Sequence, residues 1–353
     1  MNFGFTDDQE TIKRTAREFL AARYKLAEVR RLALEDERGF TDAQWDELAG
    51  LGWPGIFVEE RFGGQGLGIV ELAILQEELG YALAPAPFFS DLSAGLVLQA
   101  AGDDAQRERW LAPLAAGERR GTLAIADAGD PVSVDGGRLG GAKHLVAEAA
   151  SADFLVVLAA GSAYVVETGA DGVSIEAQQG LDPTRKLFAV TLDGAEAEEL
   201  AGAGADALGR AQEAISVALA AESVGVAQRA MEMAVEYAKD RKQFETPIGA
   251  FQAVSHRCAQ MLLEVEGARS VTLYAAWTLD HEPASASLAA SMAKAYASDA
   301  GWRVTASALQ VHGGIGFTWE HDLHFFLKRA KANAHAFGDS RSHRARVAEL
   351  AGV

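Results

Sequence analysis

The chain has 353 residues, of which 49% are apolar, so it can bury a large core and is long enough for two or three packed units. Its net charge of −18 argues against nucleic acid or an anionic membrane surface as a main partner, although a local basic pocket can still hold a phosphate. The single cysteine, Cys258, excludes internal disulfides and a cysteine-based metal site, and we expect no metal and a small, buried thiol.

The first 14 residues carry acids early and contain no apolar core of signal-peptide length. No apolar run in the chain approaches the length of a membrane span. These features predict a cytoplasmic enzyme or binding protein without a membrane partner.

Residues 1–118 have the pattern of helices joined by short polar turns. Thr6 and Thr41 each stand three residues before a glutamine, as in a capping box, and each follows a phenylalanine that can act as a hydrophobic staple. The glycine-rich stretch from Gly63 to Gly68 fails as a dinucleotide-binding fingerprint, because the glycine spacing is wrong and no βαβ pattern precedes it. We predict a loop that leads into a helix.

The pattern changes from about Gly121 to Gly202, where short runs rich in β-branched residues are bounded by Gly, Asp or Pro. This stretch predicts a small β-barrel or β-sandwich. Long helical periodicity then returns in three segments, with a break at Pro283, and a shorter fourth segment ends near Gly338. The expected fold is α+β: an N-terminal helical domain (1–118), a middle β domain (119–205) and a C-terminal four-helix bundle (206–353).

Three motifs accompany this order of elements. They are RKQF at residues 241–244 with a Phe-Gln pair at 251–252, QVHGGIGF at 310–317, and RFGGQG at 61–66. Together with the element order, they resemble the acyl-CoA dehydrogenase family over nearly the whole chain. The resemblance implies FAD as the cofactor and these cofactor-binding residues: Arg241, Phe244, Gln252, Gln310, Gly313 and Gly314.

The chemistry of these residues agrees with a phosphate-bearing cofactor. An arginine at a helix end offers a charged fork to a pyrophosphate, and a glycine pair lets backbone amides approach closely. The alternative for Arg241 alone is a solvated charge that is favourable at the C-terminal end of a helix. The combination of Arg241 with Phe244, Gln252 and the Gln310–Gly316 turn favours the cofactor.

In this family a glutamate removes the α-proton of an acyl-CoA thioester while hydride leaves the β-carbon for the flavin. The usual Tyr-Glu-Gly-Thr motif that carries this base aligns with residues 336–339, which places Phe337 at the glutamate. The second known position of the base aligns near Ile215 and Ser216, which are not acidic. Asp339 is the better candidate for a relocated base, and we expect Glu222 to be a packing or interface residue.

The middle domain also departs from the family pattern. Ala126 replaces a hydroxyl residue that contacts the flavin, and Leu145 and Ala147 replace the aromatic and hydroxyl residues of a strand that lies against the flavin ring. In the family, one subunit supplies the flavin ring contacts and the base, while the arginine, phenylalanine and glycine-rich turn reach across to the neighbour's adenine and pyrophosphate. This chain keeps the reaching half and lacks much of the receiving half, which resembles the smaller, base-lacking subunit type of heteromeric members.

The resemblance therefore implies a flavoprotein oxidoreductase for 2,3-dehydrogenation of an acyl-CoA, acting as a partner subunit. The alternatives are a self-sufficient dehydrogenase with Asp339 as base, and a flavin-free acyl-CoA-binding or scaffold protein. Expected partners are the acyl-CoA substrate, a second copy or a larger dehydrogenase subunit, and electron-transfer flavoprotein as the electron acceptor. Loss of the ring contacts suits a large, branched or polycyclic acyl group, as in fatty acid or steroid side-chain β-oxidation.

Overall fold

The computed structural model describes residues 4–353, so part of the N-terminal stretch discussed above, residues 1–3, lies outside the described residues. Contacts divide the chain into two compact units. Unit 1 comprises Met1–Arg30, Ile69–Ala84 and Ser216–Val353, and unit 2 comprises Arg31–Gly68 and Pro85–Ile215. This division does not follow chain order, and the three-domain boundaries near residues 118 and 205 stay a prediction.

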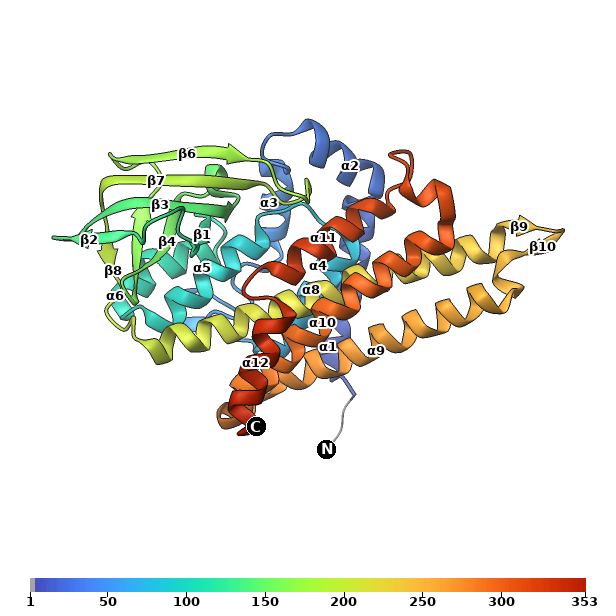
Figure 1. The fold of residues 1–353 in the computed structure, drawn as a ribbon. Coiled ribbons are helices and arrows are strands. Elements are labelled where there is room, and N and C mark those ends of the chain that lie inside the picture. The colour runs from blue at the N-terminus through green and yellow to red at the C-terminus, as the bar shows by residue number, and fades with distance from the viewer. Residues whose placement is uncertain (1–3) are drawn as a thin grey trace. The chain divides into compact units, whose positions relative to one another are not determined.

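Unit 1 is helical. Its long helices α8, α9 and α10 run side by side, and α10 also packs against α11 and α12 (Figure 1). The helices with residues in this unit are α1 (Asp7–Arg23), α2 (Leu26–Glu35), α4 (Ile69–Ala82), α8 (Ala205–Asp240), α9 (Gln252–His281), α10 (Pro283–His312), α11 (Leu323–His335) and α12 (Ser340–Ala351), with short turns η4 (Ile248–Ala250) and η5 (Gly313–Phe317) and a hairpin of β9 (Lys242–Gln243) and β10 (Thr246–Pro247).

The helix boundaries follow local signals in the sequence. Thr6 caps α1 with a complete capping box, and Pro283 occupies the first turn of α10, where its missing N–H costs nothing. The predicted last helix does not simply end near Gly338, because α12 follows the break with Asp339 as its N-cap. Cys258, expected to be buried, is half-buried on α9.

Helices α4 and α8 approach each other unusually closely. A Cβ at Gly80 would lie 2.2 Å from the carbonyl oxygen of Glu222, and a Cβ at Gly225 would lie 1.9 Å from that of Glu77. No side chain fits at such distances, so glycine at both positions lets the two backbones touch.

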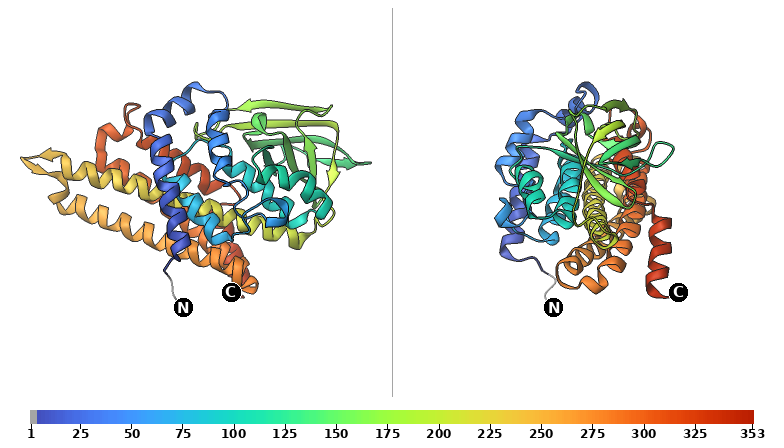
Figure 2. Two further views of the ribbon diagram at one scale, coloured as in Figure 1. Left: turned by 180° about the vertical axis from the view of Figure 1, so that it is seen from behind. Right: turned by 90° about the vertical axis from the view of Figure 1, so that its left-hand side faces the viewer.

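Unit 2 contains the two four-stranded sheets, which Figure 2 shows from two further directions. Its sheets have the strand orders β1-β4-β5-β8 and β2-β3-β7-β6, and every pair in them is antiparallel except β1 with β4. The strands are β1 (Gly121–Ala124), β2 (Ser133–Asp135), β3 (Arg138–Ala147), β4 (Phe154–Ala159), β5 (Ser162–Glu167), β6 (Val173–Gln178), β7 (Leu187–Glu196) and β8 (Glu198–Glu199).

Alternating apolar residues of the two sheets share one core, which includes Leu139 of β3, Leu155 and Val157 of β4, and Val190 and Leu192 of β7. The predicted β domain is therefore confirmed as a two-sheet structure, with core residues on facing surfaces. The helices and turns of unit 2 are α3 (Asp42–Gly50), η1 (Glu60–Phe62), α5 (Phe88–Ala101), α6 (Asp104–Gln106), η2 (Arg107–Leu111), α7 (Ala112–Ala115) and η3 (Ala149–Ser151).

Two smaller predictions for unit 2 are also confirmed. Thr41 caps α3 with a complete capping box, and the stretch from Gly63 to Gly68 is a loop before α4. Among residues 4–353, no helix combines the length and the apolar character needed to span a membrane.

Candidate functional site

The predicted cofactor residues of the RKQF motif lie where α8 ends. Arg241 follows the last residue of α8, and its carbonyl oxygen accepts a hydrogen bond from the Ile248 amide at 2.8 Å, which closes the β9–β10 hairpin. Phe244 and Glu245 form the tip with φ angles of 53° and 61°, the left-handed pair that a two-residue hairpin turn requires. The Phe244 side chain is 90% exposed and forms a T-shaped contact with Phe251, at 6.4 Å between ring centroids. The hairpin projects from one end of the bundle (Figure 1).

The glycine-rich turn lies at the same end. Tyr237 in the last turn of α8 stacks on His312 in the last turn of α10, with ring centroids 4.5 Å apart. This contact places Arg241 and Gly313, which follow these two helix ends, in the same part of unit 1. The structure thus brings together the residues of two motifs that are about 70 positions apart in the chain.

The geometry of this end fits a pyrophosphate. Gly313 has a φ of 63°, and a Cβ at Gly314 would meet no heavy atom within 4 Å, so the backbone here is open to a ligand. The side chains of Arg241, Gln252 and Gln310 are exposed. The charged fork and the open glycine backbone are together able to hold a phosphate group.

The turn between α11 and α12 carries Phe337. Phe337 is half-buried and has a φ of 57°, and Gly338 follows with a φ of 94°. The Phe337 carbonyl oxygen accepts a hydrogen bond from His343 Nε2 at 2.9 Å, and the Gly338 carbonyl oxygen accepts one from Lys294 Nζ at 2.8 Å. Phe337 thus places an apolar ring on a turn that is held from two sides.

Asp339, the candidate for a relocated base, is the N-cap of α12. Its carboxylate accepts hydrogen bonds from the Ser342 amide at 2.8 Å and the Ser342 hydroxyl at 2.9 Å. The bond from the Ser342 amide lowers the pKa of Asp339 below its usual value. A carboxylate with a lowered pKa and a capping role is a poor proton acceptor.

Glu222 of α8 is buried against Arg329 of α11, and both side chains are 2% exposed. The Glu222 carboxylate is also 3.3 Å from Gln76 Nε2 of α4. The expectation of a packing role for Glu222 agrees with these contacts, because its charge is already paired in the core.

The β3 strand of unit 2 carries the departures from the flavin-contacting pattern. Lys143 is buried, and its Nζ donates to the Ile125 carbonyl at 2.9 Å, to Asp127 Oδ1 at 2.6 Å and to the Leu158 carbonyl at 2.6 Å. Beyond Lys143 the strand bulges, and Leu145 has a φ of 54° and is 55% exposed. Leu145, predicted from the motif to replace an aromatic residue, is thus a solvent-exposed aliphatic side chain.

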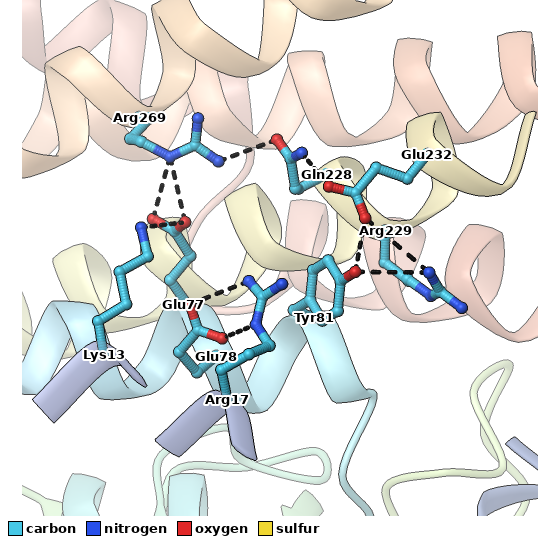
Figure 3. Close-up of polar contacts among 9 residues, drawn as sticks. All are labelled: Lys13, Arg17, Glu77, Glu78, Tyr81, Gln228, Arg229, Glu232 and Arg269. Carbon is cyan, nitrogen blue, oxygen red and sulfur yellow. Dashed lines mark hydrogen bonds and ion pairs between the residues drawn. The ribbon is translucent and has the colours of Figure 1, made fainter. Parts of the chain in front are cut away.

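A polar cluster lies among α1, α4, α8 and α9 (Figure 3). Glu77 of α4 bonds with Arg269 of α9 at 3.1 Å, and Arg17 of α1 pairs with Glu78 of α4. The Tyr81 ring lies 3.5 Å from the Arg17 guanidinium carbon, and its hydroxyl donates to a further carboxylate, that of Glu232. The other members are Lys13, Gln228 and Arg229. Each of its glutamates has a basic or hydrogen-bonding partner, so the cluster ties four helices together and offers no unpaired base.

Two buried lysines, Lys143 and Lys294, were not predicted from the sequence. A lysine in a strand or helix pattern is expected to face solvent, and the carbonyls that bind these two come from distant parts of the chain. For Lys143, one local signal could have indicated a special role. It stands two residues before the position where the family's strand motif has an aromatic residue. Among residues 4–353, no cluster of three or more His, Cys, Asp or Glu side chains is arranged to hold a metal ion.

Comparisons with known proteins agree with this arrangement. Residues 6–118 match the profile of the acyl-CoA dehydrogenase N-terminal domain, and residues 203–351 match that of the acyl-CoA dehydrogenase C-terminal domain. The chain is 32% identical to the acyl-CoA dehydrogenase IpdE2 of Mycolicibacterium smegmatis, over 97% of this chain and 98% of that protein.

Two solved structures are similar over almost their full length. A variant of the Tcur3481-Tcur3483 steroid ACAD has a TM-score of 0.90 and 30% identity, covering 98% of both chains. The ChsE4-ChsE5 complex from Mycobacterium tuberculosis has a TM-score of 0.92 and 27% identity, covering 100% of this chain and 99% of that chain.

Proposed function

Because the chain belongs to the acyl-CoA dehydrogenase family, a family of FAD-dependent oxidoreductases, we propose that it is the smaller, base-lacking subunit of a heteromeric acyl-CoA dehydrogenase. In this role it contributes Arg241 and the Gly313–Gly314 turn to FAD held with a larger subunit, and the larger subunit supplies the glutamate. The observation that carries the proposal is Phe337 at the position of the base, beside an Asp339 already used as a helix cap.

The retained residues at the end of the bundle, those of the RKQF motif and of the glycine-rich turn, support a role in cofactor binding. When bound, FAD accepts the hydride that leaves the β-carbon of the acyl group. Arg241 would neutralise the pyrophosphate, and the absence of a Cβ at Gly313 and Gly314 would let its oxygens approach the backbone of the turn. The exposed rings of Phe244 and Phe251 offer apolar faces to the adenine end. A scaffold without flavin would have no use for this set at one end of the bundle.

The substrate class and assembly are supported by the solved relatives. One similar structure is named as a steroid ACAD and another as a complex of two different proteins. We therefore propose a CoA thioester with a large, polycyclic acyl group, a hetero-oligomer with a larger dehydrogenase subunit, and electron-transfer flavoprotein as acceptor. The exposed Leu145 and the small Ala126 and Ala147 agree with a chain that does not itself enclose the flavin ring.

Co-expression with a larger acyl-CoA dehydrogenase, taken from the neighbouring genes if one is encoded there, tests the proposal. We expect a yellow mixed complex that oxidises acyl-CoA, and activity that is lost when the glutamate of the larger subunit becomes glutamine. The matched change on this chain, Asp339→Asn, should leave the rate unchanged. Strong acyl-CoA oxidation by this chain alone, abolished by Asp339→Asn, would instead identify a self-sufficient enzyme.

A further inference from the structure

Lys294 is a buried lysine on α10 that the proposed function does not use. Its side chain is 1% exposed, and its Nζ donates to the Gly338 carbonyl oxygen at 2.8 Å and to Ser298 Oγ at 3.0 Å. The first of these bonds joins residues 44 positions apart. Burying an ammonium group is unfavourable unless it is bound by polar partners, so this lysine needs a structural reason to be there.

The turn that Lys294 contacts has an unfavourable backbone conformation at its first residue. Phe337 has a φ of 57°, a left-handed conformation in which the Cβ of an L-residue is crowded, and phenylalanine lacks the short polar side chain with which asparagine or aspartate favours this conformation. The two carbonyls of this turn point to two separate donors, since Lys294 Nζ binds Gly338 and His343 Nε2 binds Phe337 at 2.9 Å. The left-handed conformation is therefore supported from α10 and from α12.

We propose that Lys294 is a positioning residue that, with His343, fixes the Phe337–Gly338 turn in its left-handed conformation. The consequence for the enzyme rests on the proposed function: holding this turn keeps the apolar ring of Phe337 in the position of the missing base. Asp339 then remains the cap of α12 and does not become a proton acceptor.

The surroundings of Lys294 give this role a pH dependence. Burial lowers the pKa of Lys294 to about 8, and the negative charges of Asp339 and Asp299 oppose that shift. Burial lowers the pKa of His343, so its ring is neutral near pH 7 and Nε2 carries the donated proton.

Other charged groups lie near this turn or along α10. The positive charges of Lys294 and Arg346 add to the lowering of the pKa of His343, and the negative charge of Asp339 opposes it. Arg344 of α12 pairs with Asp299, Arg303 of α10 pairs with Glu264 of α9, and Lys331 of α11 lies 4.6 Å from the Trp302 ring. The η5 turn, Gly313–Phe317, contains no charged residue.

The direction of the pH effect follows from linkage. When the turn opens, Lys294 becomes solvated and its pKa returns to about 10.4. The open state therefore binds the proton more tightly, so opening becomes less favourable as the pH rises from about 8 to about 10, by up to about tenfold per unit. Below pH 8 both states are protonated, and opening no longer depends on this group.

Amide hydrogen exchange of the full chain, read on peptides spanning residues 332–345, tests the proposal. We expect protection in this segment, corrected for intrinsic exchange, to rise between pH 8 and pH 9.5. Lys294→Met should speed exchange there roughly 10- to 100-fold at pH 7, as expected for the loss of a charged hydrogen bond, and should abolish the pH dependence. Lys294→Arg should restore part of the protection without the pH dependence.

Lys331→Met is the matched control, because it removes a neighbouring lysine that binds a tryptophan ring instead of the turn. It should behave as the wild type. The proposal is overturned if Lys294→Met leaves the exchange of this segment unchanged, or keeps its pH dependence. Since the measurement needs neither flavin nor the larger subunit, it can succeed even where the partner-subunit function fails.

Discussion

Arg241 and Asp339 show how differently two charged residues can be used at the end of a helix. Arg241 follows the C-terminus of α8 with an exposed side chain, whereas Asp339 precedes α12 and its carboxylate accepts hydrogen bonds from the amide and the hydroxyl of Ser342. The first is available to a ligand, and the second is engaged by its own helix. The predictions for these two residues are therefore opposite.

Arg241→Ala should weaken FAD retention in the mixed oligomer by about 1.5–3 kcal/mol, the contribution of a hydrogen bond to a charged group. Arg241→Lys should recover only part of this, because the planar fork is lost. Flavin content after dialysis and the dissociation constant measured by fluorescence check both. Arg257→Ala removes another exposed arginine near the start of α9 and serves as the control. Equal flavin retention in all three variants would make Arg241 merely a solvated helix-end charge.

Asp339→Asn should leave the free energy of unfolding nearly unchanged, since asparagine caps a helix about as well as aspartate. Asp339→Ala should cost about 0.5–2 kcal/mol, because the Ser342 amide loses its acceptor. Urea unfolding measures both changes. If Asp339 were a catalytic base, Asn would lower turnover by about two to four orders of magnitude without affecting stability. The comparison of the two variants thus separates a cap from a base.

Among the elements, the contact between α4 and α8 is the one that tolerates least change. Gly225→Ala should destabilise unit 1 by about 1–3 kcal/mol or more, because its Cβ would lie 1.9 Å from the Glu77 carbonyl oxygen and neither helix backbone can give way easily. Gly209→Ala is the control on the same helix, where a Cβ meets nothing within 4 Å. It should stabilise by up to about 1 kcal/mol through helix propensity. Thermal unfolding of both variants decides, and equal melting temperatures would contradict the close contact.

The same elements indicate how far the sequence could predict the fold. The caps at Thr6 and Thr41 and the start of α10 at Pro283 depend on residues within one turn, so they were predictable. Helix α12 was not expected as a separate element, because its start depends on the two left-handed residues Phe337 and Gly338. That conformation is stabilised by Lys294, a residue too distant in the chain for any local pattern to indicate.

For the candidate site, the motifs indicated which residues to consider together, but not the contacts that bring them to the same end of the bundle. The stacking of Tyr237 on His312 that brings the two motifs together joins residues far apart in the chain. The replacement of the base by Phe337 could be recognised from the alignment of a motif. The use of Asp339 as a cap could not, because it required knowing that a helix follows.

For the molecule as a whole, the departures from the family's pattern of base and flavin-contacting residues are spread over both units. Phe337 belongs to unit 1, while Ala126, Leu145 and Ala147 belong to unit 2. A function lost through several independent residues cannot be regained by restoring one of them. We therefore expect that restoring a single residue, such as the glutamate at position 337, does not restore activity.

The isolated chain should accordingly contain substoichiometric flavin and show little dehydrogenation of any acyl-CoA, and Phe337→Glu should not restore it. The new carboxylate would stand on a half-buried turn, where burial without a partner is unfavourable, and Ala126, Leu145 and Ala147 would still lack the hydroxyl and aromatic groups that contact a flavin ring. Phe337→Leu, which keeps the position apolar, is the matched control for any loss of stability. Flavin absorbance and single-turnover reduction with acyl-CoA, measured for the chain alone and in the mixed complex, provide the test. Flavin reduction by the isolated Phe337→Glu variant, absent in Phe337→Leu, would show that the missing base is the only defect and that unit 2 still supports a complete site.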